Sequence, residues 1–145
     1  MSEIIKLSIT VNSVIDNLSE CGLPEGDPEI NIFTTDATLT VSERVMKLAF
    51  KEQSDSGEIT STIFVTDSDV RLYKRGAIEA DMHFIEGESQ KTIYRIGPYA
   101  FDMEIATKKI RSSISASGGE LALIYAMNVG GQDKNVRMKI TAKRN

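Results

Sequence analysis

Apolar and polar residues alternate with a period of two along most of the chain. In the first such segment the apolar residues occupy the odd positions: Ile5, Leu7, Ile9 and Val11. The same alternation returns in six further segments: 45–50, 59–65, 78–84, 99–105, 121–129 and 136–140. Successive side chains of a strand point to opposite faces, so this period is typical of strands with one buried face. No segment has a comparable helical stripe with caps. The pattern therefore predicts an all-β protein.

Short turn signals separate the alternating segments. They are rich in glycine, serine and aspartate and lie at 54–57, 66–69, 75–76, 86–89, 97–98, 117–119 and 130–133. Glycine readily adopts the positive φ of tight hairpins, and Asp and Ser bond to their own backbone in turns. Strands joined by short turns pair antiparallel, because parallel pairing needs a long crossover. We expect an up-and-down meander of about 8–10 strands that closes into a β-barrel, since closure removes exposed edges.

One connection is longer than the others. Residues 17–29 contain two prolines, two glycines and four acidic residues, a composition typical of a loop. We therefore predict a long loop between the first two strands. The length of 145 residues predicts one domain, so we expect residues 1–145 to form a single β-barrel domain.

Charge is distributed unevenly along the chain. Residues 1–104 contain 9 Lys/Arg and 19 Asp/Glu, a net charge of −10, whereas residues 105–145 contain 8 Lys/Arg and 2 Asp/Glu, a net charge of +6. An asymmetry of this kind can mark a surface for an anionic partner. Alternatively, acidic and basic strands simply become neighbours in one fold, where cross-strand charge pairs stabilise the sheet.

The number of cysteines and the N-terminal residues indicate in which cellular compartment the protein is expected. Cys21 is the only cysteine, which excludes an internal disulfide and indicates a reducing environment. Residues 1–15 alternate between apolar and polar side chains, unlike a signal peptide or a membrane span. We expect a cytoplasmic protein without membrane association.

The only histidine, His83, shares its strand parity with Glu79 and Asp81. A histidine beside carboxylates could act as a general base or a metal ligand. The three side chains are spread along one strand, at about 6.6 Å per alternate position, and face water if the apolar parity faces the barrel. One histidine and one cysteine cannot build a zinc site of Cys/His type, and no nucleophile or phosphate-loop motif is present. We therefore predict no catalytic residue, no metal site and no cofactor, and a protein that is not an enzyme.

Four segments resemble the YwiB-like bacterial proteins, a family of unknown function. They are VRLYKRGAIEADMHFIEGE (70–88), TIYRIGPYAFDMEIATKKI (92–110), LALIYAMNVGG (121–131) and VRMKIT (136–141). The resemblance runs from Leu7 to Thr141 and implies a calycin-like (lipocalin-like) antiparallel β-barrel. It brings no catalytic residues, and the chain lacks the tryptophan of the lipocalin signature. The loop at 17–29 looks longer than in the family, and by analogy with calycins it could cover one mouth of the barrel.

A barrel of this size suggests a ligand inside it, because an eight-stranded barrel holds either side chains or one small ligand. Our principal hypothesis is a small, partly apolar ligand in the barrel interior. The candidate lining residues are Leu72, Met82, Phe84, Tyr94, Phe101, Met103, Tyr125 and Met127. Methionine adapts to irregular shapes, which suits a packed core as well as a pocket. The sequence leaves open whether the barrel is hollow, and it does not define the ligand or the oligomeric state.

An alternative function uses the basic C-terminal region. Six residues could form a positive band on the barrel: Lys108, Lys109, Arg111, Arg137, Lys139 and Lys143. This basic face, within residues 105–145, would serve an interaction module that binds an anionic protein or RNA partner. No aromatic residue accompanies these positions and the isoelectric point is about 5.1, and both facts argue against nucleic-acid binding.

Overall fold

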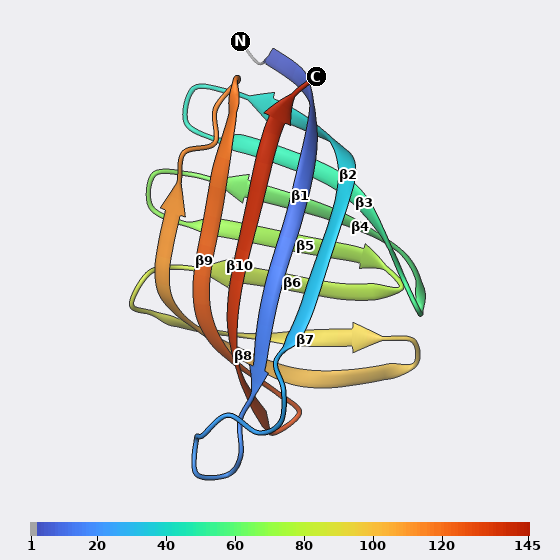
Figure 1. Cartoon of the computed structure of the whole chain (residues 1–145), viewed down its shortest axis with the longest axis vertical. Coiled ribbons are helices and arrows are strands. Elements are labelled where there is room, and N and C mark those ends of the chain that lie inside the picture. The colour runs from blue at the N-terminus through green and yellow to red at the C-terminus, as the bar shows by residue number, and fades with distance from the viewer. Residues whose placement is uncertain (1–2) are drawn as a thin grey trace.

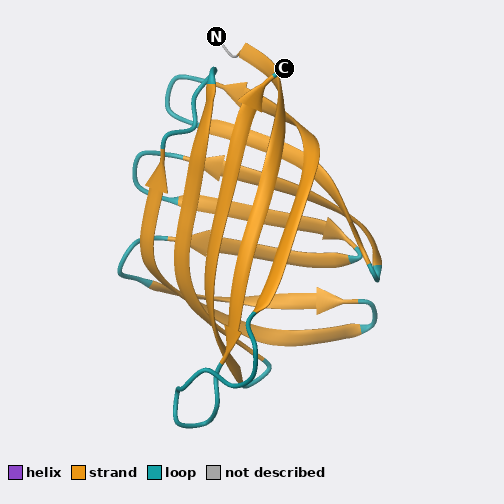
Figure 2. Ribbon diagram, in the orientation of Figure 1, coloured by secondary structure: helices purple, strands orange, loops and turns teal. Residues whose placement is uncertain are grey.

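The computed structural model describes residues 3–145, which form ten β-strands and no helix (Figures 1 and 2). Within this range, therefore, no helix is long and apolar enough to cross a membrane. The strands are β1 (Glu3–Asn17), β2 (Glu29–Val41), β3 (Met46–Ser54), β4 (Gly57–Val65), β5 (Val70–Gly76), β6 (Ile78–Phe84), β7 (Ser89–Ile96), β8 (Tyr99–Ser112), β9 (Gly118–Val129) and β10 (Gln132–Arg144). Each strand pairs antiparallel with its neighbours in the chain, and β1 also pairs with β10, which closes the barrel. The predicted all-β, antiparallel, up-and-down barrel is confirmed.

Two groups of strands cross each other in the barrel. Figure 1 shows the long strands β1, β2, β9 and β10 side by side in front, with the shorter strands β3 to β7 crossing behind them. Strand β8 joins the two groups, since it pairs with β7 through Tyr99–Ala106 and with β9 through Met103–Ser112. We call β9, β10, β1, β2 and the C-terminal half of β8 the front sheet.

The hydrogen-bonded ladder is incomplete between β2 and β3. These strands pair only through Ala37–Val41 and Met46–Phe50, although β2 begins at Glu29. In the described part of the chain, residues 29–36 of β2 and 51–54 of β3 thus have no ladder partner on their facing sides. We call this interruption the β2–β3 seam. A second short ladder, through Ile78–Ala80, joins β6 to β7.

One end of the barrel interior is a solid apolar core. Its buried side chains include Leu7, Ile9, Leu39, Leu48, Val70, Phe84, Ile105, Leu121 and Leu123. These residues occupy the apolar parity of their strands, as the alternation predicts. The rings of Phe84 and Tyr125 lie with their centroids 4.8 Å apart within this packing. Full burial of one such side chain contributes about 1.5–3 kcal/mol, so this end of the barrel anchors the fold.

The loop predicted at 17–29 corresponds to the connection between β1 and β2. Its residues 20–28 are exposed. The loop has internal order, because the backbone N–H of Ser19 donates a hydrogen bond of 2.8 Å to the carbonyl of Leu23. In Figure 1 the loop projects from the end of the barrel opposite the two chain ends.

Candidate ligand-binding site

The other half of the barrel interior is hollow. A cavity of about 670 Å³ lies there, and side chains from the inner faces of the strands line it. Its apolar wall consists of Val11, Ile15, Phe33, Phe50, Leu72, Met82, Met103, Tyr125, Met127, Val129, Val136 and Met138, among others. Pockets for small molecules in proteins have volumes of about 300–1,000 Å³. The cavity therefore has room for one small ligand.

The cavity opens at the β2–β3 seam. Its rim is formed by Glu29, Asn31 and Ile32 of β2 and by Gln53, Ser54 and Asp55 of β3 and the following turn. These are segments without a ladder partner, so the incomplete pairing of the wall creates the mouth. No residue of the loop 18–28 is part of the lining, so the covering of one mouth predicted for this loop is not observed.

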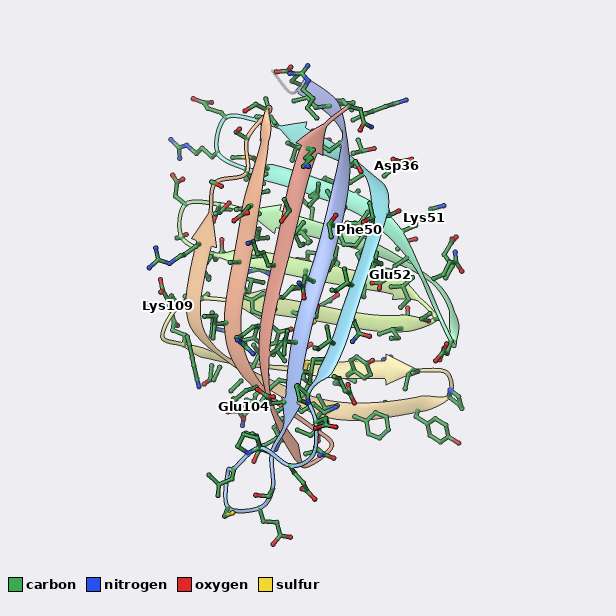
Figure 3. All side chains as sticks on the ribbon, viewed as in Figure 1. Asp36, Phe50, Lys51, Glu52, Glu104 and Lys109 are labelled. Carbon is green, nitrogen blue, oxygen red and sulfur yellow. The ribbon has the colours of Figure 1, made fainter. Side chains whose placement is uncertain are left out.

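An ion pair lies on the inner wall of the cavity. Nζ of Lys74 lies 3.7 Å from Oε1 of Glu52, and these side chains are only 26% and 19% exposed. The hydroxyl of Ser61, which is fully buried, donates a long hydrogen bond of 3.5 Å to the same carboxylate oxygen. In Figure 3 Glu52 lies beneath the front sheet, whereas the adjacent Lys51 projects outward. Charges taken out of water need such partners, because an unpaired buried charge is strongly unfavourable.

Two further polar side chains reach the cavity. Burial, and to a smaller degree the negative charge of Glu52, raises the pKa of Tyr94 above its usual value. Its hydroxyl therefore keeps its proton at neutral pH and can donate a hydrogen bond. Lys134 lies on the inner face of β10, is half-buried, and forms no ion pair with any residue in the described range. The cavity thus combines apolar side chains with polar groups that can fix the orientation of a ligand.

Six of the eight residues predicted to line the interior do line the cavity: Leu72, Met82, Tyr94, Met103, Tyr125 and Met127. Two differ. Phe84 is completely buried in the solid core. Phe101 is 39% exposed and packs near Gly130, because the hairpin of β7 and β8 extends beyond the closed wall of the barrel. The side chain of Phe101 lies on the inward parity of β8, but at this point it faces open space rather than the cavity.

The sequence patterns did not single out the polar groups of the cavity, Glu52, Ser61, Lys74 and Lys134. A signal was nevertheless present for the charged ones. Glu52 follows Phe50 and Lys74 follows Leu72 on the inward parity of the same strands, and Lys134 precedes Val136 in the same way. A charged residue that continues an apolar parity points into the interior.

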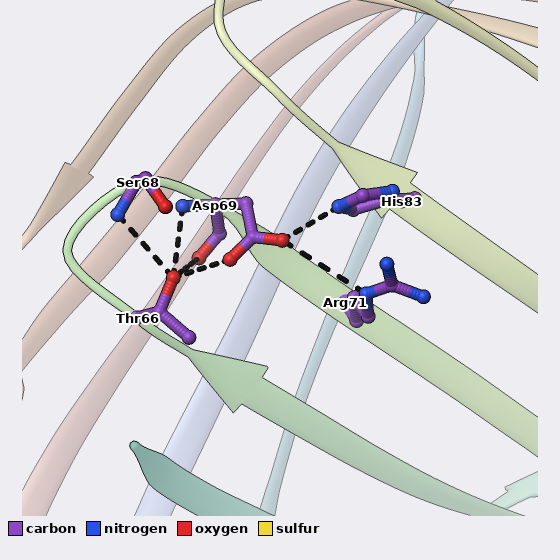
Figure 4. Close-up of polar contacts among 5 residues, drawn as sticks. All are labelled: Thr66, Ser68, Asp69, Arg71 and His83. Carbon is purple, nitrogen blue, oxygen red and sulfur yellow. Dashed lines mark hydrogen bonds and ion pairs between the residues drawn. The ribbon is translucent and has the colours of Figure 1, made fainter. Parts of the chain in front are cut away.

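His83 lies outside the barrel, as the parity of β6 predicts. Its Nε2 atom is 2.6 Å from Oδ2 of Asp69, and Nε of Arg71 is 3.9 Å from the same oxygen (Figure 4). The hydroxyl of Thr66 donates a hydrogen bond to the other carboxylate oxygen of Asp69. This network ties the turn between β4 and β5 to β6, and none of its members lines the cavity. Asp81 is exposed and forms an ion pair of 2.7 Å with Arg75.

Among residues 3–145, no group of three or more His, Cys, Asp or Glu side chains is arranged to hold an ion. The cavity offers hydrogen-bond donors on Lys74, Lys134 and Tyr94 and an acceptor on Glu52.

The six basic residues predicted to form a positive band are all exposed on the outer surface: Lys108, Lys109, Arg111, Arg137, Lys139 and Lys143. They lie on β8 and β10, with β9 between these strands. Lys139 forms an ion pair of 3.4 Å with Glu120 of β9.

These features define a class of protein: a small, closed antiparallel β-barrel of ten strands that is solid at one end and hollow at the other. The chain belongs to the family described as "Domain of unknown function (DUF1934)", whose sequence model matches residues 20–141.

A relative and a solved structure extend the comparison. The chain is 24% identical over 142 residues to "Uncharacterized beta-barrel protein YwiB" of Bacillus subtilis (strain 168), across 97% of this chain and 95% of that protein. The crystal structure of the ywiB protein from Bacillus subtilis matches with a TM-score of 0.85 and 23% identity, over 98% of this chain and 93% of that chain. The resemblance to YwiB-like proteins is thereby confirmed. At this level of identity the structural likeness establishes the fold alone.

Proposed function

We propose that the protein is a non-enzymatic barrel that binds a small, partly apolar ligand in its cavity. The observation that carries this proposal is the ion pair of Glu52 and Lys74 in the wall of an open cavity that is lined by both apolar and polar side chains. Replacing a buried ion pair by apolar side chains is often neutral or stabilising. A pair kept at this place is better explained by recognition of a polar group than by stability.

The apolar and polar side chains that line the cavity suggest how such a ligand would be oriented. Its apolar part would contact the valine, phenylalanine and methionine side chains of the wall, of which the methionines adapt to irregular shapes. Its polar part would meet the ammonium group of Lys74, the carboxylate of Glu52 and the hydroxyl of Tyr94. The ligand would enter through the β2–β3 seam, where the cavity opens.

We further propose a cytoplasmic location. The free and exposed thiol of Cys21 supports it, because exposed single cysteines are best preserved in reducing compartments.

Native mass spectrometry of the protein purified gently from cells tests ligand binding. We expect a population heavier than the chain by the mass of a small molecule, and we expect denaturation to release that mass. The emptied and refolded protein should then enhance the fluorescence of anilinonaphthalene sulfonate, which is a small amphipathic probe.

A matched pair of variants separates the cavity from the surface. Met127→Trp fills the cavity and should abolish both the added mass and most of the probe fluorescence. Ile124→Trp places the same side chain on the outer face of the same strand and should leave both signals unchanged. If the purified protein carries no added mass and the two variants bind the probe equally, the proposal is wrong.

A further inference from the structure

A second surface, on the outside of the front sheet, brings exposed isoleucines next to basic residues. The strand register aligns outward-facing residues of β8, β9, β10, β1 and β2 in rows across the sheet. One row consists of Lys109, Ile124, Arg137, Val14 and Ile30. The next consists of Arg111, Ala122, Lys139, Asn12 and Ile32. We call these two rows the outer patch; Figure 3 shows its face of the barrel, with Lys109 labelled on β8.

The outer patch is divided into a basic half and an apolar half. The basic half lies over β8, β9 and β10 and contains four exposed cations. The apolar half lies over β1 and β2, where Ile30 and Ile32 are 61% and 62% exposed and the half-buried Val14 lies beside them. Ile124 lies between the cations and is 39% exposed. Large apolar side chains that are exposed together, rather than singly, are typical of interaction sites.

The basic charge of this region is not neutralised by the acidic part of the chain. In the described structure, no ion pair joins residues 1–104 to residues 105–145. Four basic residues of 1–104 pair with acidic residues of the same part: Lys51, Arg71, Lys74 and Arg75. The one pair within 105–145 joins Lys139 to Glu120. Three cations of the outer patch therefore remain available for an external anion.

We propose that the outer patch docks a protein segment that carries acidic residues next to apolar ones. A nucleic acid would use the cations but not the isoleucines, and neither row contains an aromatic side chain on which a base could stack. An anionic bilayer would extend past the two rows, where acidic residues share their rows with cations: Asp36 lies in the row of Lys143, and Glu104 is the cross-strand partner of Lys91. A protein segment of limited size can be confined to the two rows, whose charged residues are all cations and whose apolar half carries two exposed isoleucines.

The dimensions of the outer patch set the length of that segment. Five neighbouring strands span about 19 Å at the usual strand spacing. A helix laid across them would need about 13 residues, or between three and four turns. Its acidic residues would lie over β8 to β10 and its apolar residues over β1 and β2. The outer patch meets the cavity only at Ile32, which also belongs to the rim; its other residues do not line the cavity.

Binding of synthetic fluorescent peptides tests the proposal. The probe is a helical peptide of about 14 residues with glutamates in one half and leucines in the other. A polyglutamate of the same length, poly(U) RNA and phosphatidylserine vesicles serve as comparison ligands. We expect the Glu/Leu peptide to bind most tightly, and its affinity to fall as salt rises from about 0.05 to 0.3 M, because salt screens exposed charges.

Variants of the basic half and of the apolar half of the outer patch measure how much each half contributes to peptide binding. Arg137→Glu with Lys139→Glu should weaken peptide binding by about tenfold or more, and Ile30→Ser with Ile32→Ser by about tenfold. The matched controls are Lys143→Glu, on β10 outside the two rows, and Ile93→Ser, an exposed isoleucine of β7; both should bind as the parent protein does. If the charge reversal impairs folding, Lys109→Gln with Arg111→Gln removes two cations from β8 instead.

Three results would overturn the proposal. The first is that the Glu/Leu peptide binds no better than polyglutamate. The second is that the isoleucine variants bind the peptide as well as the parent protein does, which would reduce the surface to a simple cation cluster. The third is that poly(U) or the vesicles bind more tightly than the peptide and lose binding in the same variants.

Discussion

Asp69 joins side chains from three positions on the outer surface of the barrel. A hydrogen bond from the hydroxyl of Thr66 is the main cause that lowers the pKa of Asp69, and His83 and Arg71 act in the same direction. Partial burial opposes them. The carboxylate therefore prefers the charged form in the folded protein, and the network depends on that charge.

The first prediction concerns the pH dependence of stability. A carboxyl group whose folded pKa is below its unfolded value binds fewer protons when folded, so it stabilises the protein at pH values above the unfolded pKa. We expect the contribution of Asp69 to be complete above about pH 4 and to disappear as the pH falls through the lowered pKa. Urea denaturation of the parent protein and Asp69→Asn, from neutral pH to about pH 2, measures this difference.

Near neutral pH the Asp69→Asn variant should be less stable by about 1–2 kcal/mol, because it weakens hydrogen bonds to a charged group. Toward pH 2 the two curves should converge. The exposed Asp67 of the same turn supplies a control, Asp67→Asn, for the loss of a surface charge. A gap between the parent protein and Asp69→Asn that stays constant over the whole pH range would contradict the prediction.

At this scale the alternation of the sequence predicted inward and outward side chains correctly for most strands. It left the charged residues of the cavity unassigned, because Glu52, Lys74 and Lys134 lie at the ends of apolar runs and keep the inward parity. Whether such a residue lies in a solid core or beside a cavity depends on the partners that other strands bring to it. Those partners are distant in the sequence, so a local pattern cannot reveal them.

At the scale of elements, the hairpin of β5 and β6 depends on Gly76. Its φ of +110° is in a region that side chains rarely adopt, and a Cβ atom there would lie 2.4 Å from the carbonyl oxygen of Glu58. That carbonyl also accepts a hydrogen bond of 3.0 Å from the backbone N–H of Ala77. The glycine thus permits a close approach between the β3–β4 and β5–β6 hairpins.

The second prediction is that Gly76→Ala destabilises the protein by roughly 2–4 kcal/mol, through backbone strain and through the clash with Glu58. Gly57→Ala is the matched control, since Gly57 has a similar φ of +125° but a Cβ would meet only the Cβ of Ala77, at 3.5 Å. Chemical denaturation of the two variants compares them. Equal losses would mean that backbone strain, and not the close approach, accounts for the effect.

The turn signals predicted the connections between the strands well, but not how far each pair of strands stays together. Tyr94 and Phe101 illustrate the limit, because they are direct partners on β7 and β8 and share the inner face. Tyr94 lines the cavity, whereas Phe101 lies beyond it and is exposed. The difference arises from the curvature of the closed barrel and the short ladder between β6 and β7. These are properties of the assembled sheet.

At the scale of the whole molecule, the barrel is solid at one end and hollow at the other, which predicts two different responses to the same substitution. Leu123→Ala would leave a new void in the solid core and should cost about 3–5 kcal/mol. Leu72→Ala would enlarge a cavity that already exists and should cost about 2 kcal/mol, because the additional term for a new void is small.

Both leucines are almost completely buried, so their exposure alone would predict the same loss. Urea denaturation of the two variants under identical conditions measures the difference. Equal losses would indicate that the interior is packed uniformly in solution, and they would remove the physical basis for ligand binding.

The hydrophobic pattern and the uneven charge are visible in the sequence. Which charged strands become neighbours is decided only when the sheet closes into a barrel. The acidic and basic parts of the chain do become neighbours, since β1 pairs with β10. They do not form ion pairs with each other in the described structure. The sequence had left these two possibilities open.

The placement of the described ends of the chain has a practical consequence. The first strand and the last strand are neighbours, and Figure 1 shows their ends together at the solid end of the barrel, opposite the 18–28 loop. A tether, fluorescent label or sensor surface attached there would leave the mouth of the cavity facing solution. The molecule is therefore suited to immobilisation through either end, with its interior still accessible to small molecules.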